Sequence, residues 1–274
     1  MRTREEGAPT ARSRHLVDLD ADHPGFRDAA YRQRRDCIAR IALAWEPGDP
    51  VPDAPYSPDE DLVWRELLAA LRPLHERWAC RDWLACRDRL GMDQRRIPQL
   101  RELNAAIQPA TAFRMAPVAG LVSARHFLER LGQGIFLSTQ YIRHHSRPLY
   151  TPEPDVVHEL VGHAASLLDP RYAALSRAFG RAAATASDAR LLELERIYWF
   201  TLEFGVVREA GALKACGAGL LSGAGELARF ASGPHLASFD PARMAATPYD
   251  PTGFQDLLFV AEDYEQILAL ARAL

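Results

Sequence analysis

The sequence predicts a mostly α-helical fold, a single domain of packed helices with small β-hairpins. Its 274 residues, 48% apolar and 25% charged, are enough to bury a sizeable core. Apolar residues recur at helical spacing through most of the chain, and strand-like runs are few and short. Strands do not alternate regularly with helices, so the pattern does not favour a parallel-sheet architecture. We expect a disordered tail over residues 1–17 and one folded domain over residues 18–274.

The elements follow from local signals in chain order. Helical spacing marks residues 31–45. Ser57, Pro58 and Glu60 form a capping box with proline in the first turn, and they predict the start of a second helix. Further helices are expected near 80–90, 98–107, 123–131, 154–168, 170–186 and 188–209, with strands at 134–141, 213–221 and 254–261 and a terminal helix at 264–274.

Charge, hydropathy and cysteine usage exclude several classes of protein. The net charge of −3 gives no sign of a nucleic acid partner or a membrane surface. No run of about 18 apolar residues is long enough to span a membrane, and no apolar stretch follows the charged N-terminus as in a secretory signal. None of the four cysteines lies in a C-x-x-C pair, which fits free thiols in a reducing cytoplasm.

Two histidines spaced five apart, His158 and His163, give the strongest chemical signal, with Glu159 beside the first. In an α-helix, five positions rotate roughly 140° past a full turn, so the two rings would not share a face. Binding one metal would need a helix end or a local distortion, which Gly162 could permit. From spacing alone, a hydrogen-bonded pair of histidines on a helix remains an equally open interpretation.

Glu203 is the second signal, because it lies inside the apolar and aromatic run 197–205. A buried carboxylate is costly unless a cation or metal accompanies it. Two histidines and one carboxylate make the facial triad of non-haem Fe(II) oxygenases. An ordinary salt bridge to one of the many arginines is the alternative.

Five segments together resemble the pterin-dependent aromatic amino acid hydroxylases, in the same order as in that family. They are 19–26 (LDADHPGF), 139–163 (TQYIRH through YTPEPDVVHELVGH), 197–205 (IYWFTLEFG), 217–222 (GAGLLS) and 225–227 (GEL). The resemblance covers nearly the whole chain from about residue 18. It implies that residues 18–274 form a catalytic domain that uses Fe(II), O2 and a tetrahydropterin to hydroxylate an aromatic amino acid.

The resemblance also assigns roles to individual residues. It implies His158, His163 and Glu203 as iron ligands. On the substrate side it implies Arg143 for the amino acid carboxylate, Trp199 against the ring, and Thr151, Asp155 and Ser222 as supporting groups. On the pterin side it implies the loop from Val122 to Ala124 and the ring of Phe127, with Glu159 and Tyr198 as catalytic neighbours facing the pterin. His144 and His145 are not expected to be iron ligands, and His145 is expected to be exposed.

The chain departs from the animal members of the family at Leu137, Ala124, Cys216 and Pro251. These departures bear on pterin affinity and ring preference. We expect an L-phenylalanine hydroxylase that forms L-tyrosine. A phenylalanine 3-hydroxylase, a tyrosine hydroxylase and a tryptophan hydroxylase are the alternatives within the class. A zinc hydrolase and a non-catalytic amino-acid-binding relative are those outside it.

The ends of the chain favour a monomer. About 17 residues precede the first family segment, fewer than the regulatory domain of animal members needs. The terminal helix at 264–274 is too short for the apolar repeats of a tetramer-forming coiled coil.

Overall fold

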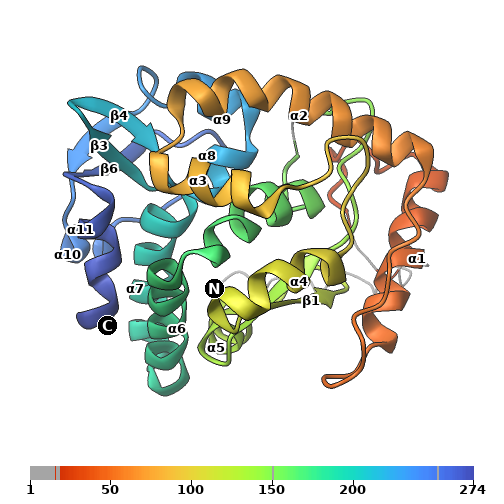
Figure 1. The fold of residues 1–274 in the computed structure, drawn as a ribbon, viewed down its shortest axis with the longest axis horizontal. Coiled ribbons are helices and arrows are strands. Elements are labelled where there is room, and N and C mark those ends of the chain that lie inside the picture. The colour runs from red at the N-terminus through yellow and green to blue at the C-terminus, as the bar shows by residue number, and fades with distance from the viewer. Residues whose placement is uncertain (1–15, 17–18, 150, 252) are drawn as a thin grey trace, which may run out of the picture.

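The computed structural model describes residues 16, 19–149, 151–251 and 253–274, and it confirms a mostly helical domain (Figure 1). Most of the predicted tail over residues 1–17 lies outside the described residues. The longer helices are α1 (Ala29–Ala44), α2 (Pro58–Trp78), α3 (Arg81–Leu90), α4 (Leu100–Thr111), α5 (Ala124–Gly132), α6 (Pro170–Thr185) and α7 (Asp188–Tyr198). None of the described helices is long and apolar enough to cross a membrane.

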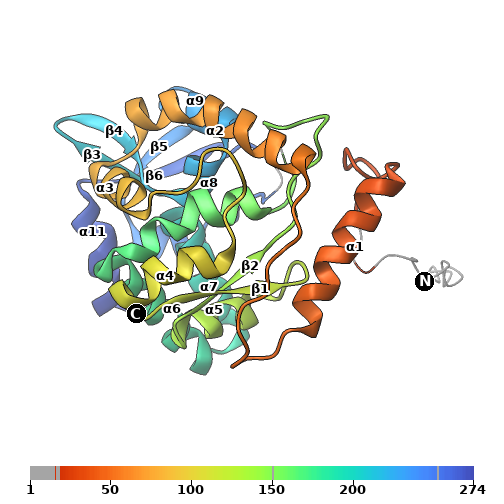
Figure 2. The same cartoon turned by 45° about the vertical axis from the view of Figure 1, so that its right-hand side comes forward.

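Helix α2 begins at the predicted capping box. The Ser57 hydroxyl accepts from the Glu60 N–H, and the Glu60 carboxylate accepts from the Ser57 N–H, which satisfies two free donors at the helix start. The helix buries Trp64, Leu67 and Leu71 in the main core. It runs along one side of the molecule beside α8 (Ala218–Ser222) and α9 (Ala224–Arg229), whereas α1 lies at the edge (Figure 2).

Two glycines allow α5 and α6 to cross in close contact. A Cβ atom added to Gly180 would lie 2.0 Å from the Gly132 nitrogen, and one added to Gly132 would lie 3.0 Å from the Gly180 carbonyl carbon. Only residues without a side chain permit this approach. The crossing fixes α6, which carries Tyr172 beneath the metal centre described below.

The strands pair differently from the prediction of small hairpins. Strands β1 (Arg114–Val118) and β2 (Ile135–Thr139) are parallel, with α5 as the crossover between them. In the second sheet, β3 (Val206–Glu209) and β4 (Ala212–Ala215) form a hairpin, and this is the only antiparallel pairing among the described strands. Strand β6 (Leu257–Ala261) runs parallel to both β3 and β5 (His235–Ser238). Sequence spacing could not show these non-local pairings.

Two predicted elements extend too far. The strand expected at 213–221 ends at Ala215, because Gly217 starts the short helix α8. The helix expected at 188–209 ends at Glu203, and the chain then turns at Gly205 into β3. A Cβ on Gly205 would lie 2.1 Å from the Thr201 oxygen, so only glycine fits this turn. Helices α10 (Pro241–Ala246) and α11 (Tyr264–Leu268) and the 3₁₀ turn η4 (Ala269–Arg272) complete the chain.

Both segments that carry the predicted metal ligands are π-helical. The π-helix η1 (His158–Ala164) is followed by the 3₁₀ turn η2 (Ser166–Leu168), and the π-helix η3 (Trp199–Glu203) continues α7. The helix expected at 154–168 is therefore not a regular α-helix. Segments of π-helix are rare in proteins, and those that occur are often found at functional sites.

Candidate metal centre

The π-helix η1 explains how histidines five residues apart meet. In a π-helix the hydrogen bonds join residues five apart, so His163 comes round to the side of His158. The two ring centroids are 4.9 Å apart, and the Nε2 atoms are 3.1 Å apart. Gly162 was expected to permit a local distortion of the helix, but in the structure it has a packing role. Its missing side chain lets η1 pack on α8, since a Cβ there would lie 2.8 Å from the Ala218 oxygen.

Glu203 reaches the same point from the end of η3. The Phe204 N–H donates to the Trp199 oxygen at 2.8 Å, a bond across five residues that closes the π-turn. One Glu203 carboxylate oxygen, Oε1, lies 3.0 Å from His163 Nε2, and the other, Oε2, lies 3.4 Å from His158 Nε2. The predicted ligands thus converge, with ligand atoms all within 4.8 Å of one another.

The charge states of these groups suit a cation. Burial lowers the pKa of His158 to about 4, so its imidazole is neutral at pH 7. Burial alone would raise the pKa of Glu203, but the two facing histidines outweigh it and hold that pKa below its usual value. Metal binding requires neutral imidazoles and an ionised carboxylate. His158 and Glu203 thus have the charge states that a divalent metal needs.

Hydrogen bonds on the far side of each imidazole orient it. The Ser222 hydroxyl donates to the Ala218 oxygen at 2.7 Å, so it accepts from His158 Nδ1–H at 3.0 Å. His163 Nδ1 lies 3.3 Å from the Tyr172 hydroxyl. With Nδ1 engaged, each ring presents the lone pair of Nε2 to the shared point, as metal-ligating histidines do.

The spacing of the donor atoms also fits a first-row metal ion. Metal bonds to imidazole nitrogen and carboxylate oxygen are about 2.1 Å long. Two such donor atoms at right angles about the metal lie about 3.0 Å from each other. The observed separations are 3.0, 3.1 and 3.4 Å. A set of two imidazoles and one carboxylate on one side of an ion leaves the opposite side open, as in non-haem Fe(II) oxygenases.

Arg143 and Asp155 form a buried pair beside this centre. The Asp155 carboxylate accepts from Arg143 Nε at 2.9 Å, from Nη2 at 2.8 Å and from the Arg143 backbone N–H at 2.8 Å. Asp155 also accepts from the His158 N–H at 3.1 Å. Among the described residues, no hydrogen bond engages Arg143 Nη1, and this end of the guanidinium is left for an anionic ligand.

Glu159 lies next to the ligands in an apolar setting. Burial raises its pKa to about 8, although hydrogen bonds from the Thr139 hydroxyl and N–H to Oε1 partly offset that effect. The group is poised to exchange a proton near neutral pH, as groups at functional sites commonly are. Thr139, at the end of β2, has no role in the sequence-based prediction.

A chain of aromatic rings links the predicted pterin side to the metal ligands. Phe127 packs edge-on against Phe136 at 5.5 Å and against Tyr198 at 5.8 Å, and Phe136 in turn lies 4.7 Å from the His163 ring. Val122 and Ala124 lie where the helix of Phe127 begins, with Val122 exposed. Phe127 therefore belongs to the core as well as to the predicted pterin site.

Trp199 stands at the start of the π-helix that ends in Glu203. Its ring stacks on Tyr249 with centroids 4.1 Å apart, and its Nε1–H donates to Gln255 Oε1 at 2.9 Å. The Gln255 amide donates to the carbonyls of Asp250 and Gly253, so the loop 250–255 fixes the indole. The result is an aromatic wall, held by Tyr249 and Gln255, at the other end of η3 from Glu203.

A family model for biopterin-dependent aromatic amino acid hydroxylases matches residues 12–273. The chain belongs to this family. It is 46% identical over 251 residues to the chloroplastic phenylalanine 4-monooxygenase of Chlamydomonas reinhardtii, covering 91% of this chain and 70% of that protein. It is 44% identical over 260 residues to the tyrosine 3-monooxygenase of Bos taurus, covering 91% of this chain and 53% of that protein. The hydroxylase thus spans about half the length of such animal relatives.

Solved structures show the same architecture. The phenylalanine hydroxylase of Chromobacterium violaceum with bound Fe(III) has a TM-score of 0.79 and 29% sequence identity, covering 86% of this chain and 89% of that one. A structure of the same bacterial enzyme with iron(III) and 7,8-dihydrobiopterin has a TM-score of 0.78, covering 87% and 90%. The family is biopterin-dependent, and this bacterial relative holds iron and a biopterin in the solved structures.

Sequence reasoning named the three side chains that converge, but it missed the residues that support them. No recognisable signal marked Tyr172, Thr139, Tyr249 and Gln255, because only the folded chain shows which side chains they contact. Of the other predicted residues, Thr151 turns its hydroxyl to the Glu153 oxygen at 2.8 Å. Among the departures from the family pattern, Leu137 and Cys216 are buried and Pro251 is exposed.

Proposed function

We propose that this hydroxylase converts free L-phenylalanine to L-tyrosine with Fe(II), O2 and a tetrahydropterin. Bound iron and pterin supply the oxygen activation, and the residues of the chain hold and orient the reactants. His158, His163 and Glu203 are the iron ligands in this proposal, with Ser222 and Tyr172 fixing the imidazoles.

The observation that carries the proposal is the Trp199 wall, at the other end of η3 from Glu203. The indole is held by Tyr249 and Gln255, so it limits the room for the ring of the substrate. A benzene ring packs against such a fixed wall, whereas the larger indole of tryptophan needs more space. The pair of Arg143 and Asp155 supports the amino acid end, because a guanidinium held flat by a carboxylate can bind a second carboxylate.

Glu159, Tyr198 and Phe127 are proposed to face the pterin, with the loop from Val122 to Ala124 beside them. The Glu159 carboxyl, whose pKa is about 8, can hold or release a proton there. Thr151 is proposed to shape the substrate side through its bond to the 153 carbonyl.

Tyrosine is the competing substrate, because the tyrosine 3-monooxygenases are nearly as similar to this chain as the algal phenylalanine enzyme. The test is an assay of the Fe(II)-loaded enzyme with a tetrahydropterin, O2 and each aromatic amino acid, with products separated by chromatography. Para-tyrosine from phenylalanine as the fastest reaction supports the proposal. Meta-tyrosine, dihydroxyphenylalanine or hydroxytryptophan as the main product would replace it by the corresponding alternative. Metal-dependent hydrolysis, or amino acid binding without turnover, would contradict the proposal that the protein is an amino acid hydroxylase.

We further propose a monomer that works in the cytoplasm. The four cysteines are free, which suits a reducing compartment. Large apolar side chains exposed among the described residues are scattered over separate elements, such as Leu43, Leu121, Leu192 and Phe254. Light scattering after size exclusion tests the first point, and a stable tetramer would contradict it. Because the algal relative is chloroplastic, fractionation of the source cells tests the second.

A further inference from the structure

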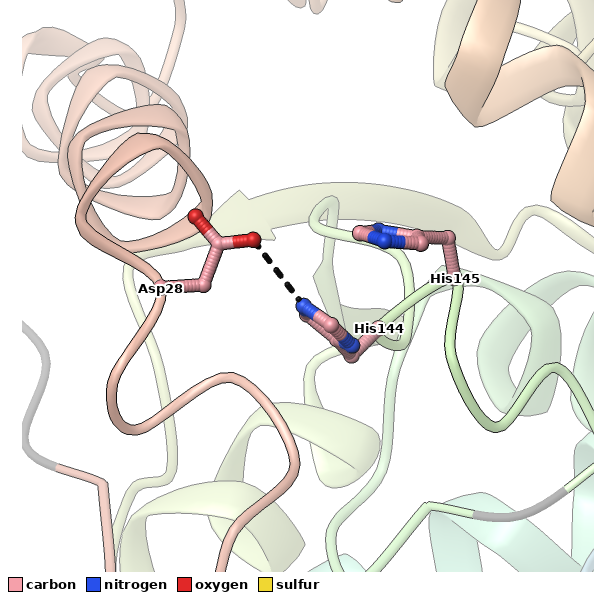
Figure 3. Close-up of side chains that lie close together, drawn as sticks. All are labelled: Asp28, His144 and His145. Atoms are coloured by element: carbon pink, nitrogen blue, oxygen red, sulfur yellow. Dashed lines mark hydrogen bonds and ion pairs between the residues drawn. The ribbon is translucent and has the colours of Figure 1, made fainter.

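A second group of metal-binding side chains, Asp28, His144 and His145, lies outside the centre described above. Their ligand atoms all lie within 4.8 Å of one another, the only such group of three besides the iron ligands in the part of the chain that the structure describes. Asp28 precedes α1, and the two histidines follow Arg143 in the loop after β2 (Figure 3). We propose that these three side chains bind a divalent first-row metal ion such as Zn²⁺.

The Asp28 carboxylate is already fixed and ionised. Its Oδ1 caps α1 by accepting from the Tyr31 N–H at 3.0 Å, and this bond is the main reason that its pKa lies below the usual value. The other oxygen, Oδ2, points at His144 Nε2 at 3.2 Å (Figure 3). One oxygen thus holds the helix start while the other is turned toward the histidines.

His144 can present Nε2 to a metal while Nδ1 keeps a hydrogen bond to the Ser146 hydroxyl. Ser146 offers Nδ1 both a donor and an acceptor, because its N–H lies 3.2 Å away and its hydroxyl oxygen 2.7 Å away. With Nδ1 protonated and bonded to the Ser146 oxygen, Nε2 carries a free lone pair. The same orientation by a bond on the second ring nitrogen is usual for metal-ligating histidines.

His145 has no structural explanation apart from this group. Its ring lies against that of His144, with centroids 4.2 Å apart and planes at 34°. Figure 3 shows the side chains of Asp28, His144 and His145 close together. The residue is exposed, and no hydrogen bond engages its imidazole among the described residues. A simple ion pair would explain why Asp28 and His144 lie together, but it would leave the position of His145 unexplained. Two imidazoles and a carboxylate oxygen are a ligand set that Zn²⁺ accepts, with water completing the coordination.

Occupation of this site would link the start of α1 to the segment that carries Arg143. His144 is the next residue after Arg143, and Asp28 is 116 positions earlier in the chain. These two segments already meet through the bond of Asp28 and His144 and through Tyr31, whose hydroxyl donates to the Ile142 oxygen, and the metal would add a further link. The inference does not depend on the proposed substrate.

The experiment measures Zn²⁺ binding to the iron-loaded enzyme by anaerobic equilibrium dialysis, with zinc and iron both counted per chain. We expect one Zn²⁺ to bind while iron is retained. His145→Ala and Asp28→Asn should each weaken zinc binding by about tenfold or more. Asn still caps a helix, so Asp28→Asn keeps α1 intact. His235→Ala, which removes another exposed histidine, is the matched control and should bind zinc as the wild type does.

X-ray absorption at the zinc edge identifies the ligands independently of affinity. The wild type should show nitrogen and oxygen neighbours with two imidazoles, and His145→Ala should show one imidazole or no bound zinc. Zinc uptake matched by an equal loss of iron would overturn the proposal. So would undiminished binding by His145→Ala, or a sulfur neighbour, which would place the ion at an exposed thiol such as Cys37.

Discussion

Asp155 holds Arg143 by two parallel hydrogen bonds in the interior and at the same time accepts from the backbone N–H of His158. One buried carboxylate therefore positions both Arg143, the proposed substrate-binding residue, and His158, the first residue of the π-helix η1. Asp155 is completely buried and Arg143 is 3% exposed, so neither charge can turn to water when the other is removed.

Asp155→Asn should destabilise the protein and weaken phenylalanine binding together. Breaking a buried pair costs about 3–5 kcal/mol, because the arginine is left uncompensated. Arg143→Lys keeps the charge but loses the flat fork, so it should raise KM for phenylalanine more than it lowers kcat. Denaturant unfolding and initial rates measure the two effects. Asp53→Asn, which breaks the exposed pair of Asp53 and Arg101, is the control and should change neither. An unaltered KM in both interior variants would contradict the assigned role of Arg143.

The three proposed iron ligands should be indispensable. His158→Ala, His163→Ala and Glu203→Ala are each expected to lose iron and hydroxylation, since each removes one of the three donors at the shared point. Glu203→Gln keeps the shape but cannot offset the metal charge, and it should also bind iron weakly. Iron content and product formation are measured in parallel. Near-normal turnover by an iron-containing variant would show that the ligands lie elsewhere.

Ser222→Ala should weaken iron binding without removing a ligand. The hydroxyl of Ser222 orients the His158 ring through Nδ1, and such supporting groups are worth about 10–100-fold in metal affinity. Tyr172→Phe tests the same effect on His163. Iron affinity is measured by competition with a chelator. Ser176→Ala is the control on α6, because the Ser176 hydroxyl bonds only within its own helix, to the Tyr172 oxygen. If Ser222→Ala and Ser176→Ala bind iron equally well, Ser222 has no role in orientation.

Trp199→Phe should shift substrate preference toward tryptophan. The smaller ring leaves room for an indole, and pocket-size effects of this kind change kcat/KM ratios by about 10–200-fold. The measurement is the ratio of kcat/KM for tryptophan to that for phenylalanine. Trp78→Phe, on α2 against Phe230, should leave that ratio unchanged. A wild type already faster on tryptophan would remove the basis of this prediction.

His75 should make the fold sensitive to acid. Burial lowers its pKa to about 4, and the neutral ring donates from Nε2 to the Leu221 oxygen at 2.6 Å. The unfolded chain binds a proton below pH 6.5, whereas the folded chain does not until about pH 4. Stability is therefore full above pH 6.5 and falls by about 3 kcal/mol as the pH drops to 4. Urea unfolding at several pH values measures this. His75→Gln should flatten the profile in this window, and an equally steep profile in the variant would assign the effect to other groups.

The helical elements could be predicted because their signals are local, and the resemblance to the family pointed to the three side chains that converge. The capping box at Ser57 is one such signal, and the apolar run around Glu203 is another. The pairing of β3 with β6 could not be predicted, because it joins segments far apart in the chain. The partners of His163 and Trp199 could not be recognised either, since Tyr172 and Gln255 resemble ordinary core and loop residues until the chain is folded.

The π-turns determine how the site tolerates changes in chain length. Each can be regarded as an α-helix with one residue inserted. In η1 the inserted residue lets the side chains of His158 and His163 meet. Removing one residue between His158 and His163, such as Val161, would restore α-helical spacing. The register of everything after it would then rotate by about 100°. Residues four apart in an α-helix share a face, so the two histidines would still lie on one side, but the chain after them would leave in a different direction. The inserted residue therefore sets the direction of the chain after His163, and deletion of Val161 should disturb how η2 and α6 pack rather than how the two histidines meet.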